Sequence, residues 1–94
     1  MPVINATVAI ADPGRLIRRL CKHFSHGIEA SWTDTAGHLM FSIGECRLAA
    51  RQGILSLTCE SPGDAELAQL ADVVASHLER FAGGEVTEVQ WQAA

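Results

Sequence analysis

Residues that could take part in chemistry concentrate in segment 15–26, with the sequence RLIRRLCKHFSH. This segment holds four of the seven Lys and Arg residues and two of the four His residues of an otherwise acidic chain. His23 and His26 are three residues apart, so on a helix their imidazoles can converge on one divalent metal ion or on haem iron. Such a site needs a third ligand, and His77 in a second helical pattern is the candidate. The sequence therefore predicts a metal site of His23, His26 and His77.

The same histidines have a structural alternative. His23 and His77 would then be hydrogen-bonded within the fold at the margin of the core, and His26 would interact with the negative end of the helix dipole. Cys21 cannot join His23 on one metal, because residues two apart on a helix point about 200° away from each other. The spacing thus restricts the metal hypothesis to the three histidines.

Basic side chains share the solvated face of the same predicted helix. Arg18, Arg19 and Lys22 are the candidates for binding an anionic ligand such as phosphate, a carboxylate, a catecholate or a hydroxamate. The alternative is a face that only solubilises the domain and complements the acidic side chains of the second helix. Those acidic residues are Asp64, Glu66, Asp72 and Glu79.

The three cysteines form no CxxC pair, so neither a disulfide framework nor a zinc ribbon is indicated. Cys46 and Cys59 should face each other inside the core as free thiols, although a cross-strand disulfide is conceivable. Cys21 lies near Arg18 and Lys22, whose charges would lower its pKa, but its nearest histidine points away. We therefore predict no catalytic residues, and an enzyme ranks third among the function classes.

Periodicity and capping signals mark the elements that carry these residues. Alternating apolar side chains from Ile4 to Ile10 predict a strand. Asp12 and Pro13 predict the start of a helix, with a carboxylate cap followed by proline at the first helical position. This helix should run to about His26, and Gly27 should end it as a left-handed cap residue.

Four short strands are predicted next, over residues 28–32, 39–43, 46–50 and 55–59. The turns between them put every apolar side chain on one face of an antiparallel meander. The expected cross-strand pairs are Trp32 with Leu39, Ala30 with Phe41, Ile43 with Cys46, Phe41 with Leu48, Leu48 with Leu57, and Cys46 with Cys59.

The last third of the chain predicts a second helix and a final edge strand. Ser61 is the expected cap of this helix, and Pro62 its first residue. Apolar residues then recur at three- and four-residue spacing until Gly83-Gly84 ends the helix. Residues 86–91 form the predicted strand, with Val89 and Trp91 facing inward.

This order of elements predicts an α+β fold of two layers. A strand, a helix, a four-strand meander, a helix and a strand would form one antiparallel sheet with both helices on one face. A helix-grip or TATA-binding-protein-like arrangement is the first choice. A ferredoxin-like fold is the second, and it requires the loss of one meander strand. The outer sheet face stays open, which suits a homodimer or another partner.

Length and composition set the remaining limits. The 94 residues are expected to form a single domain, 1–94, and 48% hydrophobic with 19% charged residues is typical of a globular chain. A net charge of -4 argues against nucleic acid and anionic membranes as partners. The N-terminus lacks the pattern of a signal peptide. Together with the unpaired cysteines, this favours a cytoplasmic location.

Several motifs together resemble a known bacterial family. They are Arg19-Leu20-Cys21-Lys22-His23-x-x-His26, Gly44-x-Cys46-x-Leu48, the segment 73–82 (VVASHLERFA) and the closing Trp91. Over essentially its whole length the chain is similar to the uncharacterised family called domain of unknown function 2218. The family pattern often has a basic residue where this chain has Gly27, and Phe-Arg-Glu where it has Gly83-Gly84-Glu85. Some members of the family appear alongside siderophore-interacting or iron-uptake proteins.

These observations predict a small cytoplasmic bacterial protein that acts as a non-enzymatic binding or accessory domain in iron or siderophore handling. Arg18, Arg19 and Lys22 would attract an anionic small molecule or an iron chelate. The three histidines would contact iron, haem or another divalent metal. The alternative is a protein-interaction module that uses the open sheet face or the basic helix, in which the histidines are structural.

Overall fold

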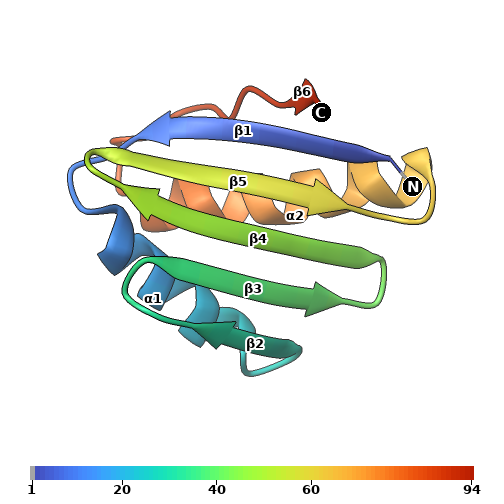
Figure 1. Cartoon of the computed structure of the whole chain (residues 1–94), viewed down its shortest axis with the longest axis horizontal. Coiled ribbons are helices and arrows are strands. Elements are labelled where there is room, and N and C mark those ends of the chain that lie inside the picture. Colours follow the sequence, from blue (N-terminus) through green and yellow to red (C-terminus); the bar gives the residue numbers. More distant parts are fainter. Residues whose placement is uncertain (1) are drawn as a thin grey trace.

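The computed structural model describes residues 2–94, which form six strands and two helices (Figure 1). In chain order the elements are β1 (Val3–Ala9), α1 (Pro13–Phe24), β2 (Glu29–Trp32), β3 (Ala36–Phe41), β4 (Gly44–Arg51), β5 (Ile54–Glu60), α2 (Asp64–Phe81) and β6 (Gln92–Ala93). In the described part of the chain, no helix is both long enough and apolar enough to cross a membrane.

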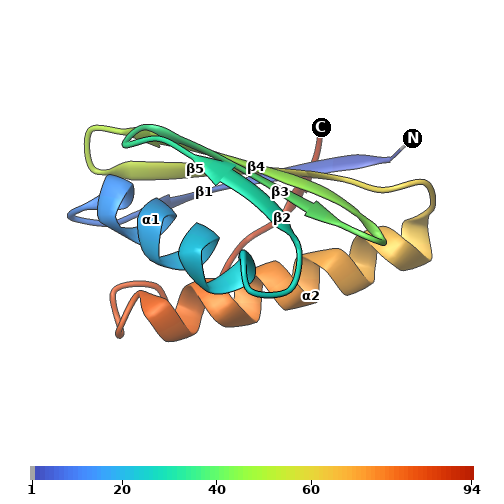
Figure 2. The ribbon, with the colours of Figure 1, turned by 90° about the horizontal axis from the view of Figure 1, so that it is seen from below.

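All six strands belong to one open sheet, in the order β2-β3-β4-β5-β1-β6, and every neighbouring pair is antiparallel. Both helices cover the same face of this sheet (Figure 2). The predicted two-layer α+β class is therefore confirmed. All four meander strands are present, so the ferredoxin-like alternative is wrong, whereas the helix-grip and TATA-binding-protein names stay predictions.

The core lies between the sheet and the two helices, as the apolar patterns predict. Helix α1 buries Leu16, Ile17, Leu20 and Phe24 against the sheet, while Arg15, Arg18, Arg19 and Lys22 are exposed on its other side. The inward-facing positions of the central strands are fully or nearly fully buried, and they are Leu39, Cys46, Leu48, Leu55, Leu57 and Cys59.

The register of the meander agrees with the prediction in one hairpin and differs in two. Leu48 pairs with Leu57 and Cys46 with Cys59, as expected. Strand β3 is displaced, however. Leu39 pairs with Ala30 instead of Trp32, and Cys46 pairs with Leu39 instead of Ile43. The displacements are two and four residues. Because side chains alternate along a strand, an even displacement leaves them on the predicted face.

The hairpin between β3 and β4 explains the larger displacement. Phe41 pairs with Gly44, so the turn consists of Ser42 and Ile43, where the prediction had Gly44 and Glu45. Gly44 instead begins β4 with a φ of +150°. The glycine was correctly recognised as a special backbone position, but it lies at the end of the turn, and the apolar Ile43 occupies the turn itself.

Helix α1 begins as predicted and ends differently. The Asp12 side chain accepts a hydrogen bond from the Arg15 backbone N–H at 3.1 Å, and Pro13 occupies the first turn. The helix ends at Phe24 with Ser25 as its cap, and Gly27 does not adopt a positive φ. The left-handed cap is therefore wrong. The backbone N–H groups of Gly27 and Ile28 both donate to the Phe24 carbonyl, which satisfies the helix end without it.

Helix α2 begins two residues later than the serine cap predicted. Gly63 is the cap residue, and the described chain shows no side-chain hydrogen bond to this helix end. Ser61 is fully buried, its backbone N–H donates to the Pro2 carbonyl, and its Oγ has no hydrogen-bond partner among the described residues. Ser61 thus continues β5 and caps nothing. The predicted end is confirmed, because Gly83 and Gly84 have φ of +61° and +98°.

The C-terminal edge strand is shorter than predicted. Residues 86–91 are not part of a strand. Of this predicted C-terminal segment and the residues after it, only β6 pairs with β1, on the side of β1 away from β5. Val89 and Trp91 nevertheless pack partly buried against the core, and Val86 is buried. The edge position and the inward-facing residues are confirmed, whereas the strand bounds are wrong.

Candidate functional site

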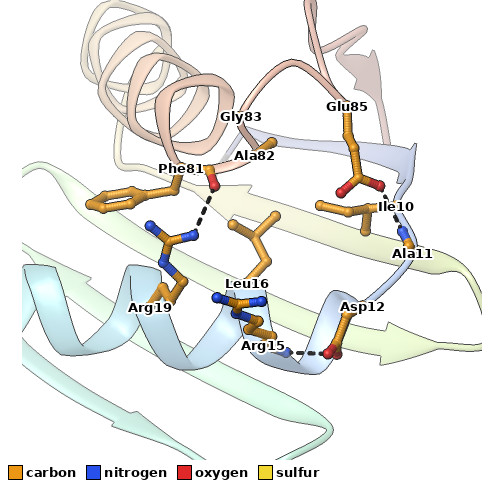
Figure 3. A pocket seen from close by; sticks show the side chains of 10 residues that line it. All are labelled: Ile10, Ala11, Asp12, Arg15, Leu16, Arg19, Phe81, Ala82, Gly83 and Glu85. Carbon is orange, nitrogen blue, oxygen red and sulfur yellow. Dashed lines mark hydrogen bonds between the residues drawn. The ribbon is translucent and has the colours of Figure 1, made fainter.

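A pocket of about 290 Å³ lies where the start of α1 meets the end of α2 (Figure 3). Its walls come from three segments that are far apart in sequence: the link from β1 to α1, the first two turns of α1, and the end of α2. Its lining residues are Ile10, Ala11, Asp12, Arg15, Leu16, Arg19, Phe81, Ala82, Gly83 and Glu85.

Arg19 is held in this pocket by the end of α2. Its guanidinium donates to the Phe81 carbonyl at 3.3 Å and lies over the Phe81 ring, 5.3 Å from the ring centre (Figure 3). The carbonyl is one of the last of the helix, where the backbone dipole attracts a cation, and the ring face adds a cation–π contact. These contacts orient Arg19 while leaving the side chain exposed.

Arg15 is the second guanidinium of the pocket, and it was not among the predicted site residues. It precedes Arg19 by four residues, so the two side chains lie on the same face of α1. The i, i+4 spacing was visible in the sequence. Arg15 lines the pocket, and Arg18 and Lys22 do not, because the end of α2 packs beside Arg15 and Arg19. This tertiary contact cannot be predicted from a local sequence pattern.

Two carboxylates form the other wall of the pocket. Glu85 Oε2 accepts a hydrogen bond from the Ala11 N–H at 2.9 Å, and Asp12 Oδ1 accepts the N–H of Arg15 at 3.1 Å (Figure 3). Both carboxylates are thus fixed by the backbone. The pocket contains two positive and two negative groups, and its apolar surface comes from Ile10, Leu16 and Phe81.

The pocket continues along the two helices into a cluster of aromatic rings. His23 contacts Phe81 and His77, with ring centres 5.2 Å apart in each pair. Phe24 lies 4.8 Å from His77 by the same measure. The His77 Nδ1 is 2.7 Å from the Val73 carbonyl oxygen. Because Phe81 contacts both Arg19 and His23, the pocket and the cluster form one strip, which we call the helix seam: Arg15, Arg19, His23, His77 and Phe81.

The structure brings together some of the predicted site residues and separates others. His23 and His77 meet, whereas His26 lies exposed in the turn after α1 and outside the ring contacts of the seam. Arg18 pairs with Asp34 at 3.5 Å on an exposed surface, and Lys22 is exposed on α1 outside the pocket lining. Among residues 2–94, no three His, Cys, Asp or Glu side chains are grouped so that they could hold a metal.

Cys21 and Cys46 lack the low pKa and the exposure that a nucleophilic thiol needs. Cys21 is fully buried, and burial raises its pKa from 9.0 to about 11. Cys46 and Cys59 are buried opposite each other on neighbouring strands, and the Cys59 thiol together with burial raises the pKa of Cys46 well above its usual value. High pKa values keep Cys21 and Cys46 protonated near neutral pH.

A second polar cluster lies on the open outer face of the sheet. Glu45 is 2.6 Å from His38 Nε2 and 3.3 Å from Arg47. The hydrogen bond from His38 lowers the pKa of the Glu45 carboxyl, and the charge of Arg47 lowers it further. The predicted turn at Gly44 and Glu45 kept Glu45 out of the strand in which it lies beside His38 and Arg47.

The chain is similar to a solved bacterial structure and matches one protein family. The NMR structure of PA4090 from Pseudomonas aeruginosa has a TM-score of 0.83 to this chain at 34% sequence identity, and the match covers 98% of this chain and 96% of that one. No curated protein matches the chain. Residues 5–92 match the family DUF2218, described as an uncharacterized protein conserved in bacteria. This chain therefore belongs to the bacterial family DUF2218.

Proposed function

We propose that the protein is a non-enzymatic binding domain whose ligand is a small anionic molecule held in the pocket of the helix seam. The observation that carries this proposal is the pair of guanidinium groups, Arg15 and Arg19, beside an apolar floor that includes Leu16 and Phe81. Planar guanidinium groups bind carboxylates through paired hydrogen bonds. A pocket of about 290 Å³ suits a molecule of one aromatic ring with its substituents.

The two carboxylates of the pocket narrow the ligand class. Asp12 and Glu85 would repel a second anionic group on their side, but their oxygen atoms can accept hydrogen bonds from hydroxyl groups. A ring with a carboxylate at one end and hydroxyl groups at the other satisfies both walls. 3,4-Dihydroxybenzoate has this arrangement, and we propose carboxylates that carry a catechol ring as the ligand class.

An iron-linked role is the more specific form of this proposal. Iron chelation takes both oxygens of a catechol and removes their protons, so the chelate can no longer donate to Asp12 or Glu85. The charges of the pocket therefore favour the metal-free, protonated catechol over its ferric complex. A role in siderophore handling would then concern the free ligand or its precursor.

Isothermal titration with dihydroxybenzoate tests the proposed function. We expect saturable binding by the wild type and an affinity at least about tenfold lower in Arg19→Gln and in Arg15→Gln, because each removes a charge-assisted contact. Lys22→Gln is the matched control, since it removes one positive charge from the same helix outside the pocket. An equal loss of affinity in all three variants would show that binding depends only on the net charge of the protein, and it would contradict the proposal.

Partner binding through the outer sheet face is the second candidate function. Its support is the partly exposed cluster of His38, Glu45 and Arg47 next to Met40, a residue that is 40% exposed. A partner or a second copy of the chain bound there would bury these residues and leave the helix seam unchanged. Arg47→Glu would then weaken association, measured by sedimentation, without changing dihydroxybenzoate binding.

A further inference from the structure

We infer that His23 and His77 form a site for one divalent transition-metal ion of the zinc and copper class, bridging α1 and α2. The site does not depend on the proposed ligand of the neighbouring pocket. Imidazole nitrogen is a preferred ligand of these metals, and the two rings come from different helices that the fold places side by side (Figure 2).

The separation of the rings fits joint binding. Metal–nitrogen bonds of about 2.0–2.1 Å place two imidazole ring centres on one tetrahedral ion about 5 Å apart. The ring centres of His23 and His77 are 5.2 Å apart, with the ring planes inclined by 39°. This separation of the ring centres is compatible with both rings binding one ion.

The orientation of His77 is a second, independent observation. Its Nδ1 is 2.7 Å from the Val73 carbonyl oxygen, so in the neutral ring Nδ1 carries the proton and Nε2 keeps its lone pair. Histidines that bind metals usually donate their other ring N–H to a carbonyl or carboxylate, which fixes the tautomer and the ring orientation. The hydrogen bond to Val73 thus prepares Nε2 of His77 as the ligand atom.

The surroundings define the type of site. His23 is exposed and His77 is half-buried, so an ion can reach the pair from solvent. The rings of Phe24 and Phe81 both pack against the His23 ring, with centres 5.4 Å and 5.2 Å away. Because no group of three protein ligands exists among the described residues, water or a bound ligand would complete the coordination. The site is therefore exchangeable, unlike the closed four-ligand sites of structural zinc.

Titration of the full chain with Zn²⁺ under reducing conditions, followed by NMR of the histidine side chains, tests the inference. We expect saturable shifts of His23 and of Nε2 of His77, whereas His38 should remain unchanged. Removing an outer partner of a metal-binding histidine typically costs about 10–100-fold in affinity. His23→Gln removes one of the two ligands at an exposed position, so it should weaken binding at least tenfold.

The controls separate a metal site from ordinary packing of rings. His26→Gln removes a neighbouring exposed histidine and should leave the affinity unchanged. A merely structural contact between the two rings predicts no saturable shift of either histidine up to millimolar zinc. That result, or an unchanged affinity in His23→Gln, would overturn the inference.

Discussion

Replacing Gly44 with alanine is expected to lower the free energy of unfolding by about 3 kcal/mol or more. A Cβ atom at this position would overlap the Glu60 carbonyl oxygen and the Ser61 Oγ, and it would lie 3.0 Å from the Leu70 side chain. The backbone φ of +150° adds strain for any residue with a Cβ. Urea denaturation followed by tryptophan fluorescence measures the loss.

Gly53→Ala is the control for this prediction. Gly53 also has a positive φ, of +71°, but nothing lies within 4 Å of the position that its Cβ would take. Its replacement should therefore lower the free energy of unfolding by only about 1 kcal/mol, which is the cost of a positive φ for a residue with a Cβ. Equal losses for both variants would show that the close approach of Gly44 to Ser61 and Leu70 contributes nothing.

Gly44 also connects the sheet to the helix seam. The close approach of β4 to Ser61 and to Leu70 of α2 places the start of this helix on the sheet, and the same helix carries His77 and Phe81. A displaced α2 should therefore weaken ligand binding in addition to stability.

The Cys21 thiol is expected to react with iodoacetamide at least about 100-fold more slowly in the native protein than in the unfolded chain near neutral pH. Burial raises its pKa from 9.0 to about 11, so the reactive thiolate is correspondingly rarer, and the fully buried side chain is also inaccessible. Mass spectrometry after timed quenching measures the rate. Rapid alkylation of Cys21 in the folded protein would restore the hypothesis of a thiol enzyme.

The same pKa shift makes folding sensitive to alkali. In the unfolded chain the Cys21 thiol ionises above pH 9.0, whereas in the folded state it ionises only near pH 11. The folded state therefore binds more protons in this window, and its stability falls as the pH rises through it. A shift of this size corresponds to about 3 kcal/mol. Cys21→Ala should show a smaller loss between these pH values.

The sequence predicted the elements better than their pairing. The apolar stripe of α1 and the pattern of inward-facing strand residues depend on local periodicity, and both are confirmed. The turn at Gln52-Gly53 is confirmed as well, because glycine occupies a left-handed position there. The turn near Gly44 was misplaced, since the same residue type also serves a close approach to α2. Alternation alone cannot separate registers that differ by an even number of residues.

The candidate site was only partly predictable. The sequence places His23 and His77 at the edges of the apolar stripes of their helices, because the position of a side chain around a helix follows from its spacing. The two rings do lie close together in the structure. The contact between the start of α1 and the end of α2 cannot be predicted from the sequence of either helix. This contact selects Arg15 with Arg19 for the pocket and leaves Arg18 and Lys22 outside it.

NMR mapping of dihydroxybenzoate binding tests the proposed function of the helix seam most directly. We expect saturable shifts of backbone amides that line the pocket, above all Ala11 and Gly83, while Arg47 and Thr58 on the outer sheet face stay unchanged. Shifts confined to the outer face would contradict binding in the pocket, as would the absence of any saturable shift around it.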